Sequence, residues 1–260
     1  MGGSADEEMN SRRSHLTLPS NSSMDCYPNN TVAQFTTKLP GVIELDGDWE
    51  VALTEISVPS PLPNALRETH FITLTSADTN EKRTYSLPTG YYESVQALVI
   101  KLNTLMSTSG VAFRYQMKRV KLVISDSYDV EISKALAQML GYSSDEGCRA
   151  RSTSHTASLP VDLSPVNIPA MYIYCDVLKH IVVGDVTAPL LRIVDMDRKE
   201  THGRMHQVLN PPMYVPLQKK HFDTIEINIM SDTGEAVPFV DGKSVVVLEF
   251  KRIGLLEKVI

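Results

Sequence analysis

Short segments in which apolar and polar residues alternate recur along the chain, and they constrain its fold more than any other feature. In FDTIEINIM (222–230), three isoleucines at every second position alternate with Thr, Glu and Asn. A period of two is typical of a half-buried β-strand. Turn residues separate the segments every ~8–12 residues, which favours a sandwich or jelly roll. Strands are predicted over 31–39, 49–58, 70–76, 82–87, 111–118, 120–125, 171–178, 180–185, 190–196, 205–210, 222–230 and 244–253.

Helix signals are confined to one window of the chain. From Ser94 the apolar residues Val95, Leu98, Val99 and Leu102 follow the spacing of one face of an amphipathic helix. Ser94 suits the N-cap. A second helix is predicted over 133–141, with Ser133 as N-cap and Gly141 as its stop, and 142–158 reads as a loop.

These signals predict an all-β dominated chain, a single antiparallel jelly-roll β-sandwich with a small α+β insertion. The predicted organisation is a disordered tail over 1–14, a first jelly-roll part over 15–87, the insertion over 88–157 and a second jelly-roll part over 158–260. The apolar end GLLEKVI is expected to dock on the body or on a neighbour.

Composition limits the function classes. The chain has 260 residues, 42% of them hydrophobic, and a formal net charge of −6, which argues against a surface dominated by phosphate binding. No apolar run approaches the ~18–20 residues of a membrane span. The N-terminal sequence lacks the pattern of a secretory signal, so an intracellular, non-secreted protein is predicted. Cys26, Cys148 and Cys175 lack metal or redox spacing and read as reduced thiols.

Candidate catalytic groups are sparse, and no catalytic, cofactor-binding or metal-ligating residue is assigned. His202 and His206 have i, i+4 spacing, but a glycine and flanking strand signals argue against a helix that would hold a metal. His180 and His221 complete no cluster with them. Asp195 and Asp197 share a strand face and read as a solvated strand end. A β-sandwich enzyme that uses these groups or Glu55 is the least favoured hypothesis.

A basic cluster lies in the predicted insertion. Arg114, Lys118, Arg119 and Lys121 stand beside Phe113 and Tyr115. Cations next to aromatic rings are typical of surfaces that bind phosphates and stack on bases. The alternative, a hairpin with a polar outer face, is preferred.

The segment LDGDWEVALTEISVP (45–59) raises a specific question. In an extended chain Trp49, Val51, Leu53 and Glu55 share one face. Trp49 is the only tryptophan and is predicted to anchor the core, Glu50 to face outward, and Asp46 and Asp48 to form a turn. Glu55 on the core face must then be paired or have a raised pKa.

The ordered set of motifs resembles the minor capsid, or penton, protein of Polinton/Maverick elements and adintovirus-like viruses. The resemblance rests on PSNSS (19–23), YPNNT (27–31) and WEVALTEI (49–56), then GYYESVQALVIKLN (90–103), LAQMLGY (136–142), YIYCDVL (172–178), VGDVTAPLLRIV (183–194) and FDTIEINIMSDTGEAVPF (222–239). It covers about residues 16–253 in order.

The resemblance implies a structural virion protein with no enzymatic activity and no cofactor. It implies a single jelly roll that forms homopentamers at the five-fold vertices of an icosahedral capsid. The implied partners are further copies of the chain and a double jelly-roll major capsid protein. Arg12 and Arg13 of the predicted tail are candidates for an inward contact with DNA or with neighbouring capsomers. The implied location is the virion. The alternative is a cellular jelly-roll binding module derived from such an element.

Overall fold

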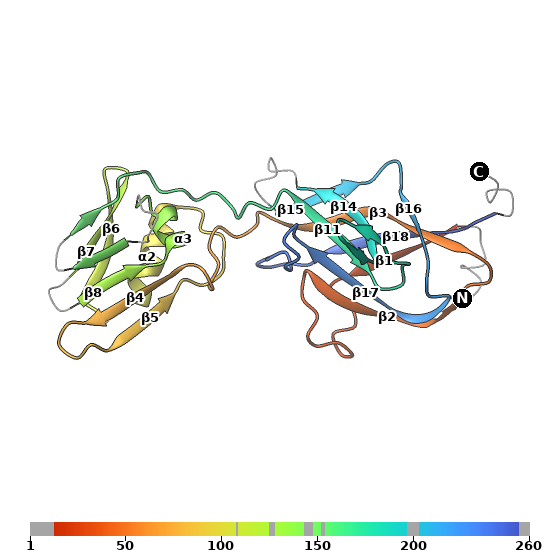
Figure 1. Cartoon of the computed structure of the whole chain (residues 1–260), viewed down its shortest axis with the longest axis horizontal. Coiled ribbons are helices and arrows are strands. Elements are labelled where there is room, and N and C mark those ends of the chain that lie inside the picture. Colours follow the sequence, from red (N-terminus) through yellow and green to blue (C-terminus); the bar gives the residue numbers. More distant parts are fainter. Residues whose placement is uncertain are drawn as a thin grey trace. The chain divides into compact units, whose positions relative to one another are not determined.

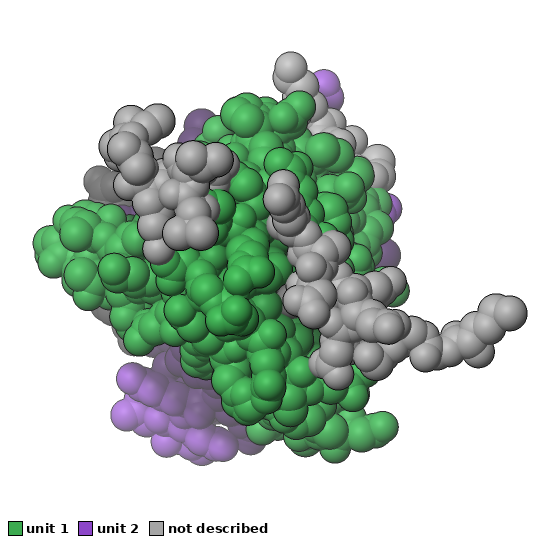
Figure 2. Space-filling view, turned by 90° about the vertical axis from the view of Figure 1, so that its right-hand side faces the viewer, with its two compact units in different colours: residues 1–61, 167–260 green, residues 62–166 purple. Residues whose placement is uncertain are grey.

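The computed structural model describes residues 13–107, 109–124, 128–142, 148–151, 154–196 and 203–254. The chain forms two compact units, which Figure 2 colours separately. Unit 1 comprises Met1–Pro61 and Asn167–Ile260, and unit 2 comprises Leu62–Val166.

Unit 1 contains two antiparallel sheets (Figure 1). The first sheet has the order β1 (Arg13–Pro19), β18 (Val245–Arg252), β3 (Trp49–Ser60) and β15 (Gly203–Val208), and β16 (Tyr214–Pro216) also pairs with β3. The second sheet has the order β14 (Leu190–Asp195), β11 (Ala170–Cys175), β17 (His221–Met230) and β2 (Gln34–Glu44). A separate two-stranded ribbon joins β12 (Ile181–Val183) to β13 (Val186–Ala188).

The strand order of unit 1 is that of a jelly roll. With β15 and β16 taken together as one strand, the strands of the two main sheets run 1-8-3-6 and 5-4-7-2 when numbered along the unit. Each sheet therefore interleaves strands from both ends of the chain, as two nested Greek keys require. The predicted fold class is confirmed. Unit 2 lies between the third and fourth strands, β3 and β11.

The core of unit 1 forms between the inner faces of the two sheets. Phe222 of the second sheet stacks on Phe250 of the first, with ring centroids 6.3 Å apart. Trp49 is buried, as predicted, and its Nε1–H donates to the carbonyl oxygen of Asp46 at 3.0 Å. This bond satisfies the one polar atom that a buried indole brings into a core.

A β-bulge divides β3 into two halves. Leu53 lies opposite Leu248 and Glu55 opposite Val247, so Thr54 is an extra residue without a cross-strand position. One extra residue moves every later side chain to the other face. Ile56 and Val58 are therefore fully buried together with Trp49, Val51 and Leu53, whereas Glu55 faces outward. The predicted placement of Glu55 on the core face was wrong.

Unit 2 is an α+β body with two sheets (Figure 1). One has the order β5 (Lys82–Ser86), β4 (Phe71–Ser76), β8 (Tyr128–Ile132) and β9 (Cys148–Arg151). The other has the order β10 (His155–Thr156), β7 (Arg119–Ile124) and β6 (Val111–Gln116). Helices α2 (Val95–Leu105) and α3 (Lys134–Met139) complete it. Its core includes Leu98 and Leu102 from α2, Phe113 from β6 and Leu122 from β7.

The boundaries of the insertion differ from the predicted 88 and 157. The hairpin β4–β5 was predicted to belong to the jelly roll, but β4 pairs with β8, and Ile72 and Leu74 join the core of unit 2. Strand signals alone do not indicate which sheet a hairpin joins. The whole of 62–166 is therefore one unit.

The two helices begin as the sequence predicts. The Ser94 hydroxyl accepts a hydrogen bond from Ala97 N–H at 3.2 Å. Ser133 occupies the N-cap of α3 but makes no side-chain cap bond, and its hydroxyl accepts from Phe71 N–H instead. Gly141 has φ +84°, and a Cβ there would lie 2.2 Å from the Leu159 carbonyl oxygen, so this stop requires glycine.

Other expectations changed or fall on residues that are not described. The predicted loop 142–158 contains β9 and β10, short strands that add to existing sheets. Of the predicted tail 1–14, residues 1–12 lie outside the described part, and Arg13 and Ser14 begin β1. Residues 255–260, expected to dock, also lie outside the described part.

Candidate functional site

A row of side chains crosses the outer face of the first sheet. The pairing places His15 of β1 opposite Glu249 of β18, Glu249 opposite Ala52 of β3, and Ala52 opposite Tyr214 of β16. Along each strand these positions alternate with core residues, such as Leu248 and Phe250 beside Glu249, so the row faces away from the sandwich core. Within the row, Ala52 and Glu249 are themselves buried by their neighbours.

Glu249 is the centre of this row. Its side chain is 9% exposed, and its Oε1 accepts a hydrogen bond from the Tyr214 hydroxyl at 2.9 Å. Ala52 stands between the two residues, and its small side chain leaves the space that Tyr214 crosses. Burial, and secondly the bond to Glu249, raises the pKa of the Tyr214 hydroxyl, so it remains a donor at neutral pH.

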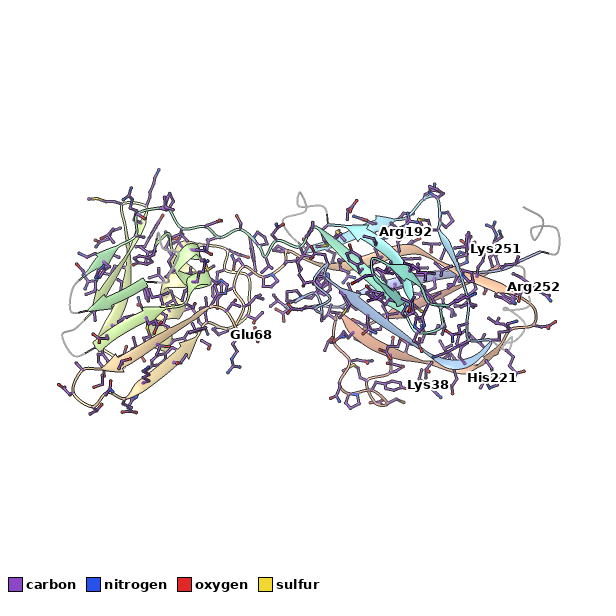
Figure 3. All side chains as sticks on the ribbon, viewed as in Figure 1. Lys38, Glu68, Arg192, His221, Lys251 and Arg252 are labelled. Atoms are coloured by element: carbon purple, nitrogen blue, oxygen red, sulfur yellow. The ribbon has the colours of Figure 1, made fainter. Side chains whose placement is uncertain are left out.

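Basic side chains surround the same carboxylate. Arg13 Nη1 lies 3.3 Å from Glu249 Oε1, and His15 Nε2 lies 3.6 Å from Oε2. In the next row, Lys251 Nζ lies 3.4 Å from Glu50 Oε1 and 5.3 Å from the centre of the Tyr214 ring. Lys251 is labelled in Figure 3. Because the Glu249 carboxylate is already paired, a partner that covers this face does not leave that carboxylate buried without a counter-charge.

The outer face of the second sheet has a different character. Ile193 of β14, Tyr172 of β11 and Met230 of β17 form one uncharged row across three strands. The next row places Tyr174 beside Asn228 and Gln34, and Gln34 Nε2 donates to Asn228 Oδ1 at 3.1 Å. Ile193 is 45% exposed. Burial, and secondly the nearby Tyr172, raises the pKa of Tyr174.

The two outer faces offer surfaces for association. Tyr and Met are enriched at protein interfaces, where aromatic rings bury a large area at low entropic cost. The first face carries the charged Glu249 row. The second face carries the uncharged row of Ile193, Tyr172 and Met230, and near it Glu226, whose Oε1 accepts a hydrogen bond from Asn228 Nδ2 at 2.8 Å. The two faces belong to opposite sides of one sandwich. A heterologous contact between identical copies requires two such surfaces of unlike composition on each copy.

Glu55 is paired, as predicted. Its Oε2 lies 3.5 Å from Nε2 of His206, and its side chain is 47% exposed. Val208 of β15 lies opposite Glu55. His206 lies two residues earlier on β15, so its side chain points to the same face as that of Val208. The bulge therefore converts a suspected buried acid into a surface pair.

Among the described residues, the remaining candidate catalytic groups do not converge. His221 Nδ1 lies 3.2 Å from Glu44 Oε1 at the far end of the second sheet. Asp195 is exposed at the end of β14, and Asp197 and His202 lie outside the described residues. Within the described ranges, no group of three or more His, Cys, Asp and Glu residues has the arrangement of a metal site.

The structure also gives the positions of Arg13 and of two of the cysteines. Arg13, proposed for a DNA contact, lies in β1 against Glu249, and Arg12 is outside the described part. Cys175 is buried, which raises its pKa to about 12, and Cys26 is exposed.

No helix among the described residues is long and apolar enough to cross a membrane.

The sequence did not reveal the Glu249 row. Glu249 is separated from Tyr214 by 35 positions and from His15 by more than 200, so their proximity depends on the strand order. One signal was present: Ala52 is a small residue at an outward position of a central strand, where a larger neighbour can lie across it.

No protein-family model and no curated protein matches the chain. The chain is similar to the crystal structure of the mavirus penton protein, with TM-score 0.45 and 10% identity over 93% of this chain and 100% of that chain. It is also similar to the structure of the Sputnik virophage, with TM-score 0.43 and 9% identity over 93% and 98%.

A third similar structure is that of the D2–D3 domains of the flagellar cap protein FliD from Escherichia coli, with TM-score 0.23 and 10% identity over 84% of this chain and 99% of that chain. All three TM-scores lie below 0.5. The jelly-roll assignment therefore rests on the strand order of unit 1.

Proposed function

We propose that the chain is a structural capsid protein, a penton subunit that forms homopentamers at the five-fold vertices of an icosahedral shell. The observation that carries this proposal is the jelly-roll strand order of unit 1, whose two outer faces carry rows of unlike character. The ordered sequence motifs over 16–253 support it, since they resemble penton proteins of Polinton/Maverick elements and adintovirus-like viruses.

A ring of identical subunits needs two different surfaces on each copy. In a closed ring with more than two subunits, the contact is heterologous, so one patch of each copy meets a different patch of the next. In the proposed ring, the Glu249 row of one copy packs against the Tyr172 row of its neighbour. The first offers a charge network that is already satisfied, and the second offers aromatic and aliphatic side chains.

The rest of the assignment follows from this role. The partners are further copies of the chain and a double jelly-roll major capsid protein, and the location is the virion. In this proposed role unit 2, which is inserted between β3 and β11, serves as a tower or rim element. The proposal assigns no enzymatic activity and no cofactor.

Charge substitutions on the second outer face test the contact. Tyr172→Glu with Ile193→Glu places two carboxylates in the proposed interface, so assembly should weaken at least tenfold while the fold is kept. Ile100→Glu is the matched control, because Ile100 is 66% exposed on α2 in unit 2. Native mass spectrometry and a melting curve measure both effects. Equal assembly of the double variant and the control would reject this interface.

A further inference from the structure

The hairpin of β6 and β7 in unit 2 has an outer face made of cations. Arg114 lies opposite Lys121, and Gln116 lies opposite Arg119. Their positions alternate with the buried Phe113, Val120 and Leu122, so they point away from the core of unit 2. Three cations therefore share one face within two adjacent cross-strand rows.

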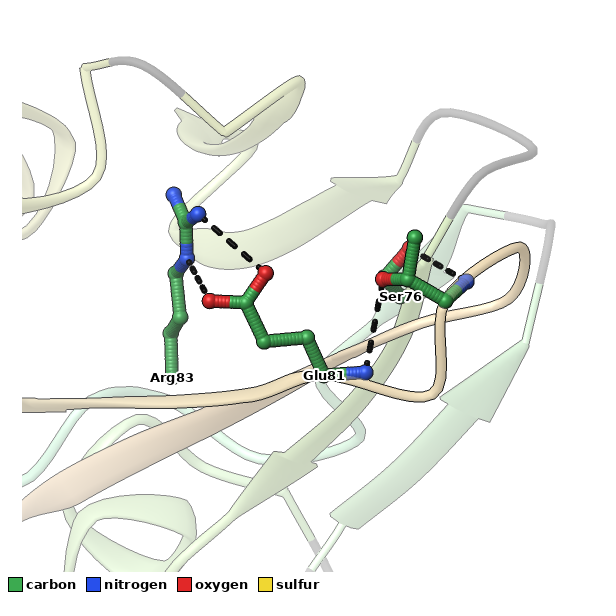
Figure 4. A network of polar contacts seen from close by, with 4 residues as sticks. Ser76, Glu81 and Arg83 are labelled. Carbon is green, nitrogen blue, oxygen red and sulfur yellow. Dashed lines mark hydrogen bonds and ion pairs between the residues drawn. The ribbon is translucent and has the colours of Figure 1, made fainter.

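These cations have no anionic partner in the described structure. No described carboxylate forms an ion pair with Arg114, Lys118, Arg119 or Lys121. Like charges that face each other directly across a ladder are destabilising. By contrast, Arg83 of the same unit is held by Glu81, with Nε–Oε1 at 3.2 Å and Nη2–Oε2 at 3.4 Å (Figure 4).

The tip of the hairpin adds a fourth cation in a constrained position. Met117 and Lys118 form the turn with φ of 50° and 63°, the left-handed region that Asn and Gly adopt more easily. Met117 is 96% exposed. The turn therefore projects Lys118 beyond the ends of both strands, next to Arg119, despite an unfavourable backbone conformation.

Charge is distributed unevenly between the two units. Residues 62–166 contain 11 of the 25 Lys and Arg and 10 of the 31 Asp and Glu, a net +1. Unit 1 carries the remaining 14 cations and 21 acidic residues, a net −7. The overall charge of −6 therefore comes from unit 1, whereas unit 2 is close to neutral and presents a local positive face.

The aromatic residues of the hairpin point to the other side. Phe113 is buried, and Tyr115 packs against the core of unit 2, so neither ring is on the cationic face. Single-stranded nucleic acids bind through stacking of bases on exposed aromatic rings. Duplexes are held by phosphate contacts that need only cations, and Arg matches phosphate oxygens particularly well. Stacking of bases on Phe113 and Tyr115, the less favoured interpretation of this cluster, is thus not available on the cationic face.

We propose that the outer face of the β6–β7 hairpin, formed by Arg114, Lys118, Arg119 and Lys121, binds the phosphate backbone of duplex nucleic acid without reading its sequence. The site lies outside the jelly roll and does not depend on the proposed capsid role. Neutralisation by phosphates removes the cross-strand repulsion between Arg114 and Lys121.

Fluorescence anisotropy of a labelled short DNA duplex, titrated with the full chain, tests the proposal. Four phosphate contacts give a slope of about −3 to −4 for the logarithm of affinity against the logarithm of salt concentration. Raising KCl from about 50 to about 200 mM should therefore weaken binding about 100-fold. A slope near zero, or tighter binding to a single strand of the same length, would overturn the proposal.

Variants separate binding from folding. Arg114→Gln, Arg119→Gln and Lys121→Gln together should weaken binding more than tenfold at low salt and reduce the slope by about 0.9 per cation removed. The matched control is Arg67→Gln, Lys101→Gln and Lys134→Gln, which removes three exposed cations elsewhere on unit 2. Equal loss in both variants would show attraction to net charge and overturn the site.

A single charge reversal supplies the sharpest discrimination. Arg114→Glu places an anion opposite Lys121, so the melting temperature should stay equal or rise while duplex binding is lost. Retained binding in this variant contradicts the proposal. Sulfated glycans and the acidic unit 1 of another copy are the competing occupants. Binding of a heparin oligosaccharide without DNA, or salt-sensitive self-association abolished by Arg114→Glu without DNA binding, would assign the face to one of them instead.

Discussion

Thr54 of β3 donates its hydroxyl to the carbonyl oxygen of Val247 on β18 at 3.2 Å, at the position where β3 holds one residue more than its partner. This bulge decides which side chains of the central strand enter the core. It lets Trp49 and Ile56, which are an odd number of residues apart, both face inward.

Deletion of Thr54 tests the bulge. Without the extra residue, inward and outward side chains alternate along β3 without interruption. If Trp49 and Leu53 stay buried, Ile56 then points to solvent. We therefore expect unit 1 to lose its cooperative unfolding. The fluorescence of Trp49, the only tryptophan, reports this unfolding. Thr54→Ala, the control, keeps the residue count and should cost only about 1 kcal/mol. Wild-type unfolding of the deletion variant would refute the role of the bulge.

Trp49→Ala should destabilise unit 1 by roughly 3–5 kcal/mol, because a buried indole leaves a large cavity. Urea denaturation followed by far-ultraviolet circular dichroism measures the change, since the fluorescent residue is lost. Trp49→Phe should cost less, as the ring stays and only the Nε1–H bond to Asp46 disappears. A loss below about 1 kcal/mol in Trp49→Ala would contradict its role as a core anchor.

Tyr214→Phe removes one donor from Glu249 and leaves the carboxylate with Arg13 and His15. A hydrogen bond to a charged group contributes about 1.5–3 kcal/mol, and partial exposure of Tyr214 places the expected loss near the lower value. Tyr91→Phe serves as the control, because no described hydrogen bond involves its hydroxyl. Equal stability of the two variants would mean that the hydrogen bond from Tyr214 to Glu249 contributes nothing to the stability of unit 1.

His70 should make unit 2 sensitive to acid. Burial lowers its pKa, and the bond to the Leu66 carbonyl opposes this only in part. The pKa of His70 is therefore lower in the folded state than its value of about 6.5 in the unfolded state. Its contribution to the stability of unit 2 is complete above that unfolded pKa and is lost as the pH falls below it.

His70→Asn supplies a non-titrating comparison for unit 2. Amide hydrogen exchange of β4 and β8, measured at about pH 7.5 and about pH 5.5, should show a larger loss of protection in the wild type than in the variant. The same loss in both proteins would assign the acid sensitivity to other groups.

The alternating segments predicted most of the long strands, because a half-buried strand leaves a period of two in the sequence. FDTIEINIM gave β17 within one residue, and WEVALTEISV gave most of β3. The bulge at Thr54 was not predicted, since one extra residue leaves no composition signal. Neither was β9, a short strand that depends on pairing with β8.

The features on the outer faces depend on strand order, which one sequence does not reveal. Glu249 meets Tyr214 because β18 and β16 both pair with β3, and Tyr172 meets Ile193 because β11 pairs with β14. The basic hairpin is different. Its strands are adjacent in sequence, so the cations on its face could be predicted before the structure was known.

The copy number of the assembled protein tests the central claim most directly. Native mass spectrometry of the purified full chain, over a wide range of concentration, weighs the oligomer against a subunit of 28.9 kDa. The proposal predicts a closed species of five subunits. A closed dimer or trimer, or a monomer at every concentration including in the presence of the major capsid protein, would contradict it.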